Sequence, residues 1–144
     1  MSLAQALSEP DKRSAVVDDC CTLVDREVSK KGGFSGVIIK AGYKTVKGIK
    51  PGFIRKVVDS LLDEWATGLD PIWSEAQQAP VPLDAFAAEH ERVAEALLGV
   101  TDAKSKNAKS AIVRSTYEKL RPSAKRNVEE AVPELGALLA KHVG

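Results

Sequence analysis

Three lysines on one side of a predicted helix are the residues in this sequence best suited to bind a ligand. The segment GGFSGVIIKAGYKTVKGIKPG contains Lys40, Lys44 and Lys47. At 100° per residue, the three lie within about 60° of one another around the helix. Ser35 and Gly36 lie near the start of that helix, where free backbone N–H groups favour anions. These five residues form a candidate site for a phosphorylated ligand, an acidic lipid surface or nucleic acid.

The same lysines also fit a structural role, because lysine commonly occupies the hydrated side of an amphipathic helix. The acidic block of residues 57–100 could neutralise them within the fold. On the opposite, apolar side of this helix lies Gly42, where the missing side chain would let another helix approach closely. The sequence leaves open whether the lysines form a site or a solvated face.

Motifs for phosphate binding and nucleophilic catalysis fail on spacing. Gly32, Gly33 and Gly36 do not match a phosphate loop, which requires G-x-x-x-x-G-K-[ST] after a strand. A nucleophile elbow around Ser35 would need glycine at position 37, which is Val37. We therefore expect no catalytic residue and no cofactor site in this segment.

The histidines and cysteines form no metal-binding motif. His90 falls within an apolar stripe and is expected to be a core or interface residue, whereas His142 is expected to act on a helix dipole. Cys20 and Cys21 point about 100° apart on a helix, so no disulfide is expected between them. An enzymatic alternative would need Cys20 to approach His90 as a thiolate pair. We expect no metal-binding or catalytic residue here, and the favoured interpretation is not an enzyme.

Charge alternates along the chain in large blocks, although the net charge is only +1. Residues 26–56 carry +8, residues 57–100 carry −8 and residues 101–127 carry +6. Such blocks are typical of complementary faces that meet within a fold, or of a dipolar surface that recruits a partner. Nucleic acid is not an expected partner, because the pI of about 7.7 lacks a strong basic bias.

Apolar spacing predicts helices almost throughout, and strand-type alternation is nearly absent. The clearest stripes cover residues 16–28 and 54–65. Ser8 is the expected cap of the first helix and Ser35 that of the second, which should run to about Ile49. Pro51 fits the first turn of the third helix.

The second half of the chain contains more predicted interruptions. The third helix is expected to end near Gly68 and to be followed by a short helix that begins at Asp70. Residues 77–83, QQAPVPL, indicate an extended connector. A break is expected near Gly99, and Pro133 should end or kink the last helix.

These signals together predict a compact all-α bundle of about six to eight helices with no significant sheet. A chain of 144 residues suits one domain with a sizeable core. The proline-containing connector leaves two descriptions open, a single domain over residues 1–144 or two helical halves, 1–79 and 83–144.

Three segments resemble a family of small bacterial proteins classed as a domain of unknown function and found in actinobacteria and some proteobacteria. They are GFSGVIIKAGYKTVKGIKPGF, LDPIW and VTDAKSKNAKSAIVRSTYEKLRPSAKRNVEEAVPELG. The resemblance extends from about Ala15 to His142. It implies a small helical bacterial protein with no established activity, so it assigns no catalytic residue and no cofactor.

The favoured hypothesis is a non-enzymatic cytoplasmic protein that acts through protein–protein contact, either with an unknown protein partner or as a homodimer. The charge blocks and the lack of a catalytic motif motivate it. The alternative is an anion-binding module that uses the lysines. A membrane partner is not expected, because no run of eighteen apolar residues exists and the apolar stripes are sized for a core.

Overall fold

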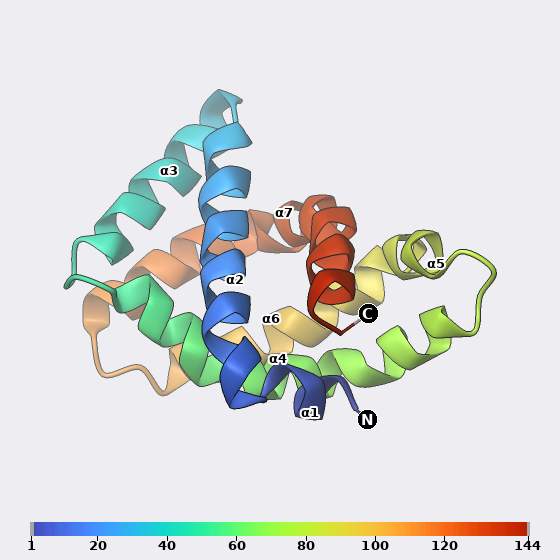
Figure 1. The fold of residues 1–144 in the computed structure, drawn as a ribbon. Helices are drawn as coiled ribbons and strands as arrows, with labels where there is room; N and C mark the ends of the chain where they lie inside the picture. The colour runs from blue at the N-terminus through green and yellow to red at the C-terminus, as the bar shows by residue number, and fades with distance from the viewer. Residues whose placement is uncertain (1, 144) are drawn as a thin grey trace.

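The computed structural model describes residues 2–143, apart from the side chains of Phe34 and Ser35. The described chain forms helices and no strand, which confirms the predicted all-α bundle (Figure 1). The helices are α1 (Leu3–Leu7), α2 (Pro10–Lys30), α3 (Gly33–Lys47), α4 (Phe53–Gln77), α5 (Pro82–Ala88), α6 (His90–Lys106) and α7 (Ala111–Val143). Within the described residues, no helix is both long and apolar enough to cross a membrane.

The core is built where α2, α4, α6 and α7 meet, with α1 packed against α4 and α5 packed against α7. Fully buried side chains come from five helices and include Leu3, Val16, Phe86, Val93 and Val132. The ring of Phe86 packs edge-on against Trp73 of α4, with the ring centroids 5.2 Å apart.

Helices from both sides of the connector pack against one another. α7 contacts α1, α2 and α3 as well as its sequence neighbours α5 and α6, and α4 contacts α6. Figure 1 shows α7 running below α3, crossing behind α2 and then changing direction in its red second half. Its interior contains Pro122 and Pro133, each of which removes a backbone hydrogen bond and favours a bend. Pro133 therefore does not end the helix.

Several predicted breaks are wrong, because the helices continue through them. α4 passes through both Gly68 and Pro71, and α6 passes through Gly99. In α4, Leu69 lies two residues before Pro71 and Ile72 directly after it, and both are buried. Their burial outweighs the local cost of a residue that disfavours helix.

Two predicted caps are also wrong. Glu9 precedes the first residue of α2, while the hydroxyl of Ser8 donates to the carbonyl oxygen of Ala4 at the end of α1. α3 begins at Gly33, after Gly32, so Ser35 lies within its first turn. The side chain of Ser35 lies outside the described part of the structure.

The third helix likewise begins later than Pro51 would place it. α4 begins at Phe53, after Gly52, whose φ of 74° lies in the left-handed region. Glycine adopts that conformation without a steric cost, so it suits this sharp turn.

The short helix α1 was not predicted, although its signal is present in the sequence. Ser2 and Gln5 form a capping box, in which the Ser2 hydroxyl accepts from the Gln5 backbone N–H and the Gln5 side chain accepts from the Ser2 backbone N–H. The N–H of Leu3 also donates to Asp70 of α4, with a distance of 2.7 Å. This bond and the buried Leu3 and Leu7 attach α1 to α4.

Candidate anion-binding groove

The helices α2 and α3 meet at a tight turn and then diverge (Figure 1). Gly33 makes the turn, with φ at 70° in the left-handed region. Gly36 lies at the closest approach of the two helices, because a Cβ atom there would lie 2.8 Å from the backbone carbon of Lys31. The divergence opens a groove between the C-terminal halves of α2 and α3.

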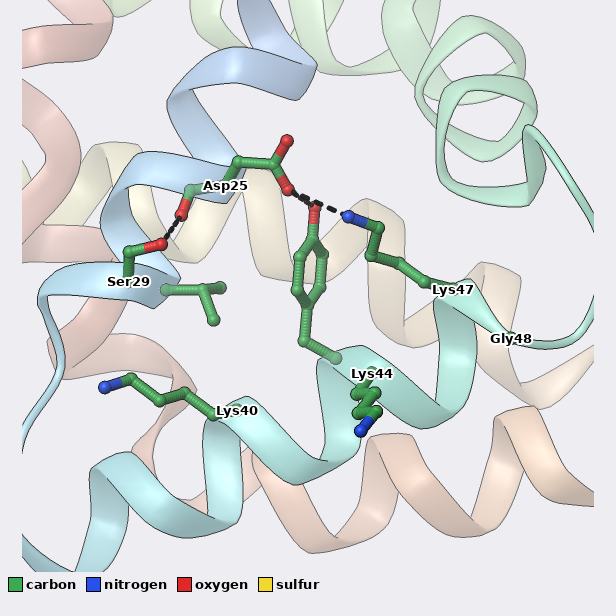
Figure 2. A pocket seen from close by; sticks show the side chains of 8 residues that line it. Asp25, Ser29, Lys40, Lys44, Lys47 and Gly48 are labelled. Carbon is green, nitrogen blue, oxygen red and sulfur yellow. Dashed lines mark hydrogen bonds and ion pairs between the residues drawn. The ribbon is translucent and has the colours of Figure 1, made fainter.

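This groove has a volume of about 720 Å³. All three lysines of the predicted stripe line it from α3, and the facing side chains come from the last turns of α2. The lining residues are Asp25, Val28, Ser29, Lys40, Tyr43, Lys44, Lys47 and Gly48. The lysine stripe therefore faces a concave surface shared by two helices (Figure 2).

One end of the groove is fixed by contacts to Asp25 of α2. The Tyr43 hydroxyl donates to Asp25 Oδ1, and Lys47 Nζ lies 3.6 Å from the same oxygen. Lys47 Nζ also lies 5.2 Å from the centre of the Tyr43 ring, a cation–π distance. Burial, together with the bond to Asp25, raises the pKa of Tyr43, so the phenol keeps its proton at neutral pH. Lys47 thus neutralises Asp25, the one carboxylate among the described residues that line the groove.

The other two lysines make no ion pair with any described residue. Lys40 and Lys44 are both exposed, and Figure 2 shows that neither ammonium group points toward Asp25. The acidic block does not reach them through Asp59 and Asp63, because Arg13 of α2 donates to both carboxylates at 2.8 Å. Two positive charges therefore remain available in the groove.

The helix N-terminus does not take part in the groove. Gly36 is buried where the helices meet, its N–H donates to the carbonyl oxygen of Gly32 at 3.2 Å, and it is not among the groove-lining residues. The side chain of Ser35 lies outside the described part. The structure thus brings the three lysines together with one another, and it places Gly36 apart from them.

Sequence reasoning missed the side of the groove formed by α2. Asp25 and Ser29 are four residues apart and therefore share one side of that helix. Ser29 donates to the backbone carbonyl oxygen of Asp25 at 2.8 Å. Their spacing was readable, but their position opposite the lysines depends on the turn at Gly33.

The residues considered for catalysis lie in separate environments. Cys20 is packed against the core, and burial raises its pKa to about 12, so the thiol is protonated at neutral pH. His90 is exposed, with Nδ1 3.7 Å from Glu129 Oε2, so it is not a core residue, and its expected alternative role at an interface stays a prediction. The reason is a helix break at Glu89, which interrupts the apolar stripe between α5 and α6.

His142 makes a specific contact as well as lying in the last turn of α7. Its Nε2 is 2.6 Å from Asp19 Oδ2 of α2, and its side chain is largely buried. The hydrogen bonds from His142 and Lys141 lower the pKa of Asp19. Within residues 2–143, no three His, Cys, Asp or Glu side chains converge as a metal site would require.

A second groove lies on the other side of α3, between α3 and the start of α7, with a volume of about 500 Å³. At its base a Cβ atom on Gly42 would lie 3.1 Å from Leu120 and 3.2 Å from Thr116 of α7. The prediction that Gly42 lets another helix approach is therefore confirmed. Ile112 lines this groove, and it is 57% exposed.

A family model, described as a family of unknown function (DUF6918), matches residues 3–143. No curated protein and no solved structure matched the chain. The match covers nearly all of the chain, including every helix that forms the bundle and both sides of the lysine groove. The chain therefore belongs to this family of unknown function.

Proposed function

We propose that this protein is a binding module for small anions, which it holds in the groove between α2 and α3. The observation that carries the proposal is the arrangement of Lys40 and Lys44. Both line the groove and neither is paired within the described residues, whereas Lys47 already neutralises Asp25. A carboxylate or phosphate group would complete the charge balance of this surface.

The size and charge of the groove fit a small ligand. Its volume of about 720 Å³ lies within the range of about 300–1,000 Å³ that small-molecule sites occupy. Each lysine contributes about 1 kcal/mol to an anion about 4 Å away in a well-hydrated setting. Binding through two lysines alone is therefore weak and sensitive to salt. The function needs no catalytic group, and two free thiols suit the reducing cytoplasm, where we place it.

Titration calorimetry with pyrophosphate tests the proposal. We expect binding at 20 mM NaCl that weakens strongly at 200 mM, and we expect Lys40→Gln with Lys44→Gln to abolish it. The matched control is Lys104→Gln with Lys106→Gln, which makes the same charge change on two exposed lysines of α6. An equal loss of pyrophosphate binding in both double variants, or no loss of binding in either, would refute a site in the groove.

A second candidate function is protein docking on the face formed by α3 and α7. Val37 and Ile112 are 66% and 57% exposed, and Ile112 and Lys119 line the second groove. Among the described residues that line this second groove, Lys119 is charged and none is acidic. Charge complementarity therefore favours an acidic amphipathic helix as the partner, laid into the groove with its apolar side inward.

Fluorescence anisotropy with a labelled peptide tests this second candidate. The peptide would carry leucines at helical spacing with glutamates elsewhere, and its control would carry lysines in place of the glutamates. We expect only the acidic peptide to bind, and we expect Val37→Ser with Ile112→Ser to weaken it at least tenfold. Light scattering that shows a dimer dissociated by the same variant would assign the face to a second copy of the chain instead.

A further inference from the structure

An apolar cavity of about 290 Å³, partly open to the surface, lies between the helices of the bundle. Five helices contribute to its wall, namely α2, α3, α4, α6 and α7. Among the residues that form it are Leu23, Ile39, Val58, Trp65 and Leu98. Well-packed cores contain few voids larger than a water molecule, so a cavity of this size requires an explanation.

The charged and polar residues that line this cavity have partners within the protein. Glu27 Oε1 lies 3.0 Å from Lys30 Nζ, Lys31 Nζ donates to Glu130 Oε2 at 2.5 Å, and the Asn127 amide donates to the Ser123 hydroxyl at 3.4 Å. The Trp65 indole N–H donates to the carbonyl oxygen of Leu97 at 3.2 Å, and the Thr101 hydroxyl lies 2.9 Å from the Tyr117 hydroxyl. Cys20 is protonated at neutral pH because burial raises its pKa. Ordered water needs two to four polar partners, so this wall favours an apolar occupant over water.

One residue connects the cavity to the lysine groove. Val28 of α2 lines the groove on one side and the cavity on the other. Lys40 and Lys44 line the same groove and are not paired within the described residues. An apolar compartment and a cationic surface therefore lie on either side of a single valine.

We propose that the cavity holds the apolar tail of an amphipathic carboxylate whose head group binds Lys40 and Lys44. The inference rests on the proposed anion-binding function and specifies its ligand class. The carboxylate lies in the hydrated groove, and the chain passes Val28 into the core. Desolvation of the tail supplies the affinity that two exposed lysines lack.

The cavity volume sets the length of the tail. A cavity of about 150 Å³ accommodates benzene, with its six carbon atoms. The cavity of about 290 Å³ therefore accommodates roughly ten carbon atoms. A medium-chain fatty acid has both the length and the single negative charge that this arrangement requires.

Quenching of Trp65 fluorescence measures occupancy of the cavity directly. The chain has two tryptophans, and Trp73 lies outside the cavity wall, so Trp73→Phe leaves Trp65 as the sole reporter. The probes are 10-bromodecanoate, which has both head and tail, and 10-bromodecanol, which lacks the charge. Bromine quenches indole fluorescence at short range, so quenching by either probe places its tail near Trp65.

Two variants separate the tail site from the head site. Ala131→Leu fills the cavity from α7, and Ala137→Leu makes the same change at an exposed position of that helix. Lys40→Gln with Lys44→Gln removes the charge of the head site. Circular dichroism checks that each variant is folded, and Ala131→Val provides a smaller filling if Ala131→Leu does not fold.

We expect both probes to quench Trp65, with the carboxylate binding at least tenfold more tightly. Ala131→Leu should weaken both at least tenfold and Ala137→Leu neither, while the lysine variant should weaken only the carboxylate. Absence of quenching, or equal effects of the two alanine variants, would overturn the tail site. If Ala131→Leu weakens binding of the carboxylate and the lysine variant does not, the result would instead overturn the proposed anion groove and the head group assigned to it.

Discussion

Replacing Gly36 by alanine tests whether the close approach of α2 and α3 sets the shape of the groove. The new Cβ atom would lie 2.8 Å from the backbone carbon of Lys31 and 2.9 Å from its carbonyl oxygen. Real Cβ atoms do not approach other atoms so closely, and backbone atoms cannot rotate out of the way. The two helices must therefore move apart at their turn.

The expected cost follows from two opposing terms. Overpacking a close contact costs about 1–3 kcal/mol. Replacing glycine by alanine within a helix gains about 0.5–1 kcal/mol. Gly36→Ala should therefore destabilise the fold by up to about 2 kcal/mol, with the overpacking term dominant.

Gly99→Ala provides the control, because Gly99 lies inside α6 with no atom within 4 Å of the added Cβ. It should stabilise the fold by about 0.5–1 kcal/mol, which raises Tm by roughly 2–3 °C for a chain of this length. Urea unfolding followed by circular dichroism at 222 nm measures both variants. The reasoning is refuted if Gly36→Ala is as stable as Gly99→Ala.

Three further changes probe other parts of the structure. Asp19→Asn should cost about 1–2 kcal/mol at pH 7, because a neutral amide replaces the charged acceptor of the hydrogen bonds from His142 and Lys141, which lower the pKa of this carboxyl group. That stabilisation is present above about pH 4 and is lost as the pH falls through the lowered pKa, so the difference in urea unfolding should shrink as the pH is lowered below about 4. In a Cys21→Ser variant, Cys20 should react with a disulfide reagent at pH 8 at least about 100-fold more slowly in the folded protein than in urea. The reason is that burial raises the pKa of Cys20 to about 12. Similar reaction rates in the folded protein and in urea would contradict a protonated, buried thiol. Gly42→Leu should destabilise the fold by about 1–3 kcal/mol in urea unfolding, because even a Cβ atom there would lie 3.1 Å from the nearest side chain of α7. Unchanged stability would show that α7 can move away from α3 without cost.

The sequence predicted helices well wherever an apolar stripe ran without interruption, as it does in α2 and in the first half of α4. It predicted breaks at Gly68 and Pro71 because both residues disfavour helix locally. The structure keeps α4 continuous there, and Leu69 and Ile72 are buried on either side of the proline. Burial of this kind is a tertiary effect that local propensity cannot report.

Only one side of the candidate site was predictable, because the other side depends on tertiary structure. Helical spacing alone placed Lys40, Lys44 and Lys47 on one side of their helix, and the structure brings all three to one groove. The facing residues of α2 could not be assigned, because their position depends on the angle at which the chain turns. The prediction that His90 could lie in the core was wrong, because a single helix break displaces the residue from the apolar stripe.

The position of α7 has a consequence for how the chain folds as it is synthesised. α7 is made after α1, α2 and α3, yet it contacts all three. At about 5–20 residues per second, its 33 residues take roughly 2–7 s to translate after α6 is complete. During that interval the apolar sides of the first three helices lack their final partner, so the nascent chain presents an incomplete core that a holdase chaperone could recognise. Closure of the bundle is thus a late event, set by the ribosome's progress along the final helix.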